Sequence, residues 1–178
     1  MNKELLKKAG IYLAIIAFFL VLAYAWVPQV LQGKIVNQPD INSYMGMSHE
    51  ASAWNAAHPD DKTFWTNSMF GGMPTVGFMS SSDGDLTAWI YRALLAGRRP
   101  ATYLFIALLG AFLLMLSAGV DKFLAVAGAI AISFCAYNFQ IIQVGHNTKM
   151  QAIAFMPWAI AAFILAYRSI GRDKWLLR

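Results

Sequence analysis

The sequence is short of charge. Only 13% of its 178 residues are charged and 58% are hydrophobic, whereas soluble proteins average about 25% and about 45–50%. So few charges cannot cover the surface of a water-facing globule. The composition therefore predicts a protein that places most of its surface in a membrane.

Cysteine is nearly absent. The single residue, Cys135, excludes both a disulfide within the chain and thiol–disulfide exchange by a cysteine pair. It lies in a long apolar segment, so we expect a small, buried packing residue. The sequence also lacks internal repeats, heptads and low-complexity tracts.

Charge is missing altogether from four windows, 9–33, 100–120, 123–145 and 150–167. A helix that crosses the hydrocarbon core needs about 20 apolar residues. The windows do not alternate apolar and polar residues, which disfavours a β-barrel. We therefore predict an all-α membrane protein of about four transmembrane helices, in a single domain over 1–178. The predicted helices span 10–30, 101–119, 123–141 and 151–168, and a large loop spans 34–99.

The first helix has an alternative interpretation as a signal peptide. Lysines precede the apolar run, and Ala23-Tyr24-Ala25 resembles a signal-peptidase site. The apolar run continues beyond it to Leu31, which favours a retained helix. Cleavage would leave the rest of the topology unchanged.

The distribution of basic residues predicts the orientation. With the N-terminus in the cytoplasm, segments 1–8, 119–122 and 168–178 hold eight basic residues, whereas the longer outer segments 34–99 and 146–149 hold six. We expect a multi-pass protein of the cytoplasmic membrane, in contact with lipids, with the loop 34–99 outside the cytoplasm. The net charge of +5 is divided between two sides of the membrane, so it does not indicate nucleic-acid binding.

The outer loop holds most of the polar chemistry, and no acidic residue falls within a predicted span. This distribution weakens the hypothesis that the protein is a small transporter, because ion-coupled transporters keep an ionisable group at membrane depth. Asn138, Gln140 and Gln143 enter the third span, where they predict either a polar cavity or interhelical hydrogen bonds. Within the loop, the sequence predicts a helix from about Asp40 to Ala57. It also predicts a short interfacial helix over 86–96, capped by Asp85.

Asp40 is the best candidate for a catalytic carboxylate, because it closely follows the first helix and lies near the membrane surface. The alternative is a simple helix N-cap. Glu50 is the second candidate. On one straight helix it would lie about 15 Å from Asp40, too far for a joint acid–base pair unless Gly46 breaks the helix. Its alternative is a solvated surface position.

Three further groups of residues are candidate ligand sites. His146 and Lys149 lie in a polar connection that we expect near Asp40, where Arg98 and Arg99 could help them to hold a phosphate; the alternative is a plain connection. Trp65 belongs to an aromatic group that suits sugar rings, a membrane interface or a small loop core. A divalent metal is the one cofactor suggested, and its weak candidate ligands are His49, His58, Asp60 and Asp61, whose spacings match no standard site.

Two motifs resemble a known family. The stretch from Phe64 to Pro74, FWTNSMFGGMP, resembles the signature of YfhO-type bacterial membrane proteins in their Bacteroidetes form. The segments 145–150 and 154–158, together with Gln38-Pro39-Asp40 and Glu50, are similar to the same family. The resemblance covers nearly the whole chain.

YfhO-type proteins resemble GT-C glycosyltransferases, which use polyprenyl-phosphate-linked sugars on the outer face of the membrane. The resemblance implies that Asp40 matches an essential aspartate of the first outer loop. Family members are several times longer, so we expect an N-terminal fragment, a truncated gene or one half of a split protein, with the remaining part as a candidate partner. The competing hypothesis is a non-enzymatic scaffold for envelope assembly.

Overall fold

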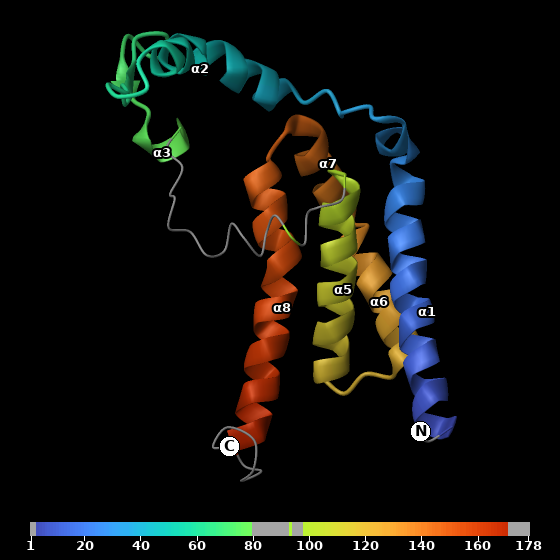
Figure 1. Ribbon diagram of the computed structural model, residues 1–178. Helices are drawn as coiled ribbons and strands as arrows, with labels where there is room; N and C mark the ends of the chain where they lie inside the picture. The colour runs from blue at the N-terminus through green and yellow to red at the C-terminus, as the bar shows by residue number, and fades with distance from the viewer. Residues whose placement is uncertain (1–2, 80–92, 94–97, 171–178) are drawn as a thin grey trace.

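The structure is a computed structural model that describes residues 3–79, 93 and 98–170. Four helices form a bundle, and the loop elements lie at one end of it, away from the start of the first helix and the end of the last (Figure 1). The helices of the bundle are α1 (Lys3–Trp26), α5 (Ala101–Ser117), α6 (Lys122–Ser133) and α8 (Asn147–Ile170), and α7 (Ala136–Val144) follows α6. The mostly helical fold predicted from the sequence is confirmed.

Helix α5 forms the centre of the bundle. Eleven of its 17 residues are buried, and it contacts α1, α6 and α8. Its core side chains Tyr103, Leu104 and Leu108 are almost completely shielded, and Phe112 meets Phe19 of α1 edge to face. The apolar composition of this helix is thus explained by protein contacts on most sides.

Helices α1 and α8 are exposed on wide apolar faces. Only Ile15, Phe19 and Ala23 of α1 are buried, whereas Leu13 and Val21 are each 66% exposed. Both helices are long and apolar enough to cross a membrane, and the pair α6 and α7 adds a third span if it is counted as one. Helix α5 is apolar but shorter, about 26 Å long. The structure thus agrees with a membrane protein, while four spans stay a prediction.

The third predicted helix, 123–141, is divided in the structure. Helices α6 and α7 meet at an angle of 41° around Phe134 and Cys135. The amide of Asn138 donates to the carbonyls of Ile132 (3.2 Å) and Ser133 (3.0 Å), which the break leaves without helical partners. Asn138 therefore satisfies backbone groups of its own broken helix. This role differs from both predicted ones, a polar cavity and interhelical hydrogen bonds. Cys135 is exposed beside the break, so its prediction as a buried packing residue is wrong.

The loop after α1 begins with a break that proline explains. Pro28 has no N–H to continue the helix, so α1 ends at Trp26 and the short 3₁₀ helix η1 (Pro28–Gln32) follows. Helix α2 (Pro39–Ala57) then starts with Pro39 in its first position, where the missing N–H costs nothing.

The rest of the described loop is a small hairpin and a helical turn. The strands β1 (Trp65–Thr66) and β2 (Met73–Pro74) pair antiparallel, and α3 (Val76–Met79) follows. The all-α prediction did not include these strands. The short helix predicted over 86–96 lies outside the described residues, apart from Ala93.

Candidate functional site

Asp40 and His146 form the central contact of the candidate site. Oδ2 of Asp40 lies 2.7 Å from Nε2 of His146, and the two side chains are about half exposed. Asp40 occupies the first turn of α2, with Gln38 as the N-cap residue, so the N-cap role considered for Asp40 is wrong. The prediction that His146 lies near Asp40 is confirmed.

Gly145 makes this approach possible. It ends α7 with φ of 113°, a left-handed conformation that side chains rarely adopt. A Cβ added there would lie only 3.2–3.3 Å from side-chain atoms of Gln38, Ile41 and Asp40. The turn therefore presses its backbone directly onto the first turn of α2 and brings the next residue, His146, to Asp40.

An amide pair next to the carboxylate joins the same two segments. Gln38 and Asn147 exchange side-chain hydrogen bonds of 3.1 Å, and Gln38 also donates to the carbonyl of Ile142. Both side chains are partly buried. Neither residue was among the predicted site residues, although each belongs to one of the motifs quoted for the family resemblance. The only sequence signal was that a side-chain amide, which can both donate and accept, lies near each of Asp40 and His146. The sequence does not show that the two amides bond to each other.

The predicted phosphate ligands have other partners in the structure. The Lys149 ammonium lies 5.1 Å from the centre of the Tyr137 ring. The Arg98 guanidinium donates to the carbonyls of Val30 (2.6 Å) and Leu31 (2.8 Å), which belong to η1, and Arg99 lies over the Tyr103 ring. His146 has a carboxylate beside it, which would repel a phosphate from the same nitrogen. This geometry favours an acid–base role for His146 over phosphate binding.

Glu50 organises the hairpin. Its carboxylate accepts hydrogen bonds from the Thr66 hydroxyl, the backbone and side-chain amides of Asn67, and the Ser68 hydroxyl at 2.8 Å. The Ser68 hydroxyl and then the two Asn67 donors hold the pKa of the Glu50 carboxyl below its ordinary value of 4.5. Helix α2 continues unbroken through Gly46, which keeps Glu50 about 15 Å from Asp40. The two acids are therefore too far apart to act as a pair, and the Glu50 carboxylate stabilises the hairpin.

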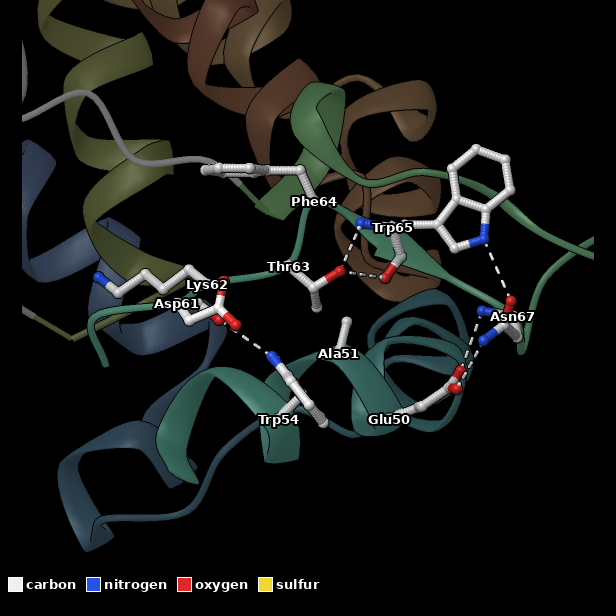
Figure 2. Close-up of a pocket in the computed structure, with 9 residues that line it drawn as sticks. All are labelled: Glu50, Ala51, Trp54, Asp61, Lys62, Thr63, Phe64, Trp65 and Asn67. Atoms are coloured by element: carbon white, nitrogen blue, oxygen red, sulfur yellow. Dashed lines mark hydrogen bonds between the residues drawn. The ribbon is translucent and has the colours of Figure 1, made fainter. Parts of the chain in front are cut away.

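Trp65 lies on the hairpin, at the edge of a groove between α2 and the segment 61–67 (Figure 2). Its indole packs against Gly72, where an added Cβ would come within 2.8 Å of the ring, and its Nε1 donates to Asn67. Half of this residue remains exposed. The structure therefore places Trp65 with Glu50, apart from Asp40 and His146.

The weak metal candidates do not come together. Among residues 3–79, 93 and 98–170, no group of three histidine, cysteine or acidic residues is placed to hold a metal ion. His58 instead stacks on Trp54, with ring centres 3.9 Å apart. His49, Asp60 and Asp61 are exposed.

No protein-family model matches this chain, and no curated protein or solved structure matches it either. The function of the chain is therefore inferred from its sequence motifs and from the contacts of Asp40 and His146.

Proposed function

We propose that this chain forms part of a GT-C-like glycosyltransferase of the bacterial cytoplasmic membrane. It transfers a sugar from a polyprenyl-phosphate carrier to a cell-envelope acceptor on the outer face. Asp40 is the catalytic base of this reaction and His146 is its partner. The observation that carries the proposal is the 2.7 Å contact between these two side chains.

The pair has the parts that a general base needs. One carboxylate oxygen of Asp40 contacts His146, and the side chain is half exposed, so its other oxygen is accessible to an acceptor hydroxyl. The hydroxyl proton passes to the carboxylate as the acceptor oxygen bonds to the anomeric carbon of the sugar. The bond from that carbon to the carrier phosphate breaks, and the phosphate leaves with the electron pair.

The position of the pair also suits a lipid-linked substrate. Asp40 lies in the first turn of α2, and His146 lies in the connection between α7 and α8. These segments are at the end of the bundle away from the start of α1 and the end of α8 (Figure 1). Under the proposed topology this end faces outward at the level of the lipid headgroups. A polyprenyl carrier, whose tail stays in the bilayer, presents its phosphate at that depth.

The second candidate function is a scaffold for envelope assembly, which one observation favours. Phe70 is 91% exposed and has φ of 51°, an unusual conformation for an aromatic residue. A strained turn that displays an apolar side chain suits a contact with a partner protein.

The test uses the intact protein in membrane vesicles and a radiolabelled polyprenyl-phosphate sugar. Asp40→Asn keeps the size of the side chain and removes the base, so transfer should fall by a factor of about 10²–10⁴. The control is Asp60→Asn, an exposed acid of the same loop, which should transfer normally. Full transfer by Asp40→Asn would reject the proposed base, and loss of function in Phe70→Ala alone would favour the scaffold.

A further inference from the structure

The groove beside Trp65 is preformed. It has a volume of about 650 Å³, within the range of small-molecule sites, and lies between α2 and the segment 61–67. Hydrogen bonds close both ends in Figure 2: Trp54 Nε1 donates to the carbonyl of Asp61 (3.0 Å), and Asn67 donates to Glu50. Between them Asn55 exchanges two bonds with the backbone of Thr63. These contacts fix the width of the groove before any ligand arrives.

The groove combines exposed aromatic side chains with two available charged groups. Trp54, Phe64 and Trp65 are each about half exposed, although His58 covers one face of Trp54. Ala51, on the α2 wall of the groove, is almost fully buried. Within the described part of the chain, neither the Asp61 carboxylate nor the Lys62 ammonium has a protein partner, and both are exposed. The two groups can therefore exchange hydrogen bonds with a ligand.

The charge of the lining limits the class of ligand. The Glu50 carboxylate is already bonded by four donors. The two charged groups that remain available, Asp61 and Lys62, have opposite signs, so a simple anion or a simple cation would meet one attractive and one repulsive group. A neutral ligand with both an apolar face and several hydroxyl groups fits best.

We propose that this groove binds a neutral oligosaccharide through its pyranose rings. The C–H faces of the rings pack on Phe64 and Trp65, and ring hydroxyls donate to Asp61 and accept from Lys62. The site is distinct from the Asp40–His146 pair, because Trp54 follows Asp40 by 14 residues on α2, about 21 Å. A polymeric acceptor can reach both. Saccharide binding does not depend on the proposed transferase function and can be measured without it.

The test measures binding to the intact protein in nanodiscs of phosphatidylethanolamine and phosphatidylglycerol. Glycoside detergents are avoided, because their sugar headgroups would compete. The probes are cellopentaose, chitopentaose and maltopentaose, and the readout is tryptophan fluorescence together with saturation-transfer NMR. Mannitol, which has hydroxyls but no ring face, is the matched ligand control. We expect at least one pentasaccharide to bind and mannitol not to bind.

Three variants assign the binding to the groove. Phe64→Ala, Asp61→Ala and Lys62→Ala remove exposed side chains and leave the backbone bonds of Thr63 and Asp61 in place. Each should weaken binding about fivefold to tenfold, the effect of about 1–1.4 kcal/mol. Phe70→Ala is the control, because Phe70 is a more exposed aromatic of the same hairpin that does not line the groove.

Three results would overturn the inference: no binding of any pentasaccharide, equal binding of mannitol, or tighter binding of choline. Failure here is separable from failure of the transferase. Protein carrying Asp40→Asn should still bind the saccharide, and loss of binding with normal transfer would reject the groove alone.

Discussion

The Asp40 carboxylate contacts the His146 ring at 2.7 Å and so ties the first turn of α2 to the connection between α7 and α8. Both side chains are half exposed, and exposed pairs contribute only about 0.2–1 kcal/mol to stability. The pair is therefore a weak source of stability. The neighbouring contacts of Gly145 and Gln38, which are more buried, hold the two segments together.

A double-mutant cycle tests whether this pair works as one unit. Asp40→Asn and His146→Gln should each change the free energy of unfolding by less than about 1 kcal/mol, while lowering sugar transfer strongly. The double variant should transfer no more slowly than the worse single variant, because residues that act together are not additive. Additive losses of transfer would show separate roles. Unfolding of either single variant would show that the pair is structural.

Gln38 should control the distance between the two segments. Gln38→Ala removes the exchanged bonds with Asn147 and leaves the Ile142 carbonyl unpaired, at a cost of about 1–3 kcal/mol. Spin labels at Ser43 and Thr148, in protein with Cys135→Ser, should show a broadened distance distribution. The matched control is Gln32→Ala, an exposed glutamine of η1. An unchanged distribution in Gln38→Ala would mean that Gly145 alone positions His146.

The hairpin should loosen in acid because of Glu50. The folded state holds the pKa of this carboxyl below its ordinary value of 4.5, so its stabilising bonds are complete above that pH. They are lost as pH falls through the lower folded value. The protection factors of the amides of Asn67 and Ser68, which correct the exchange rates for their intrinsic pH dependence, should fall over that interval. Glu50→Gln should remove this acid dependence, while Asp60→Asn should keep it; protection factors that stay constant with pH in the unaltered protein would contradict the prediction.

Much of the site is predictable from the sequence, because charged residues and turn residues mark it locally. The helical composition, the polar connection at His146 and its proximity to Asp40 follow from hydropathy and from the order of the segments. The role of Glu50 does not follow, because its four donors come from the hairpin, whose pairing depends on tertiary contacts. The N-cap of α2 was misplaced by two residues because Pro39 fixes the first helical position ahead of Asp40.

The break between α6 and α7 was not predicted for a related reason. An uninterrupted apolar window shows where a segment prefers to be, and it does not show whether its backbone bonds continue. Asn138 stabilises the break by donating hydrogen bonds to the two carbonyls that lose their helical partners, and its side chain is almost fully buried. From the sequence alone, we expected Asn138 either to line a polar cavity or to form an interhelical hydrogen bond.

Asn138 should therefore be required for the bent pair. Asn138→Leu removes both donors from the carbonyls of Ile132 and Ser133, and each unsatisfied group costs about 1–3 kcal/mol. The midpoint temperature of thermal unfolding, measured in nanodiscs, should fall. Gln140→Leu, an exposed position on the same helix, serves as the control and should unfold normally. Equal stability of the two variants would show that lipid or water satisfies the carbonyls instead.

The packing of α5 on α8 should depend on Gly110. Alanine normally favours a helix by about 1 kcal/mol over glycine. Here, however, an added Cβ would lie 2.5 Å from Cδ1 of Trp158 and 3.2 Å from the Ala154 carbonyl oxygen. The indole would have to move, which breaks its 2.9 Å hydrogen bond to the Ile106 carbonyl. We expect Gly110→Ala to lower the free energy of unfolding by about 1–3 kcal/mol, as overpacking does.

Two further variants isolate the contact behind this prediction. Gly10→Ala, in α1, meets no atom within 4 Å and should leave stability unchanged or slightly higher. Trp158→Ala should remove most of the effect of Gly110→Ala when the two are combined, because the indole that blocks the new methyl group is gone and only the 3.2 Å contact with the Ala154 carbonyl oxygen is left. The measurement is equilibrium unfolding of all four variants in the same mixed micelles. If Gly110→Ala costs as much with Trp158 absent as with it present, α8 does not approach α5 through this glycine, and the close packing of the two helices must have another basis.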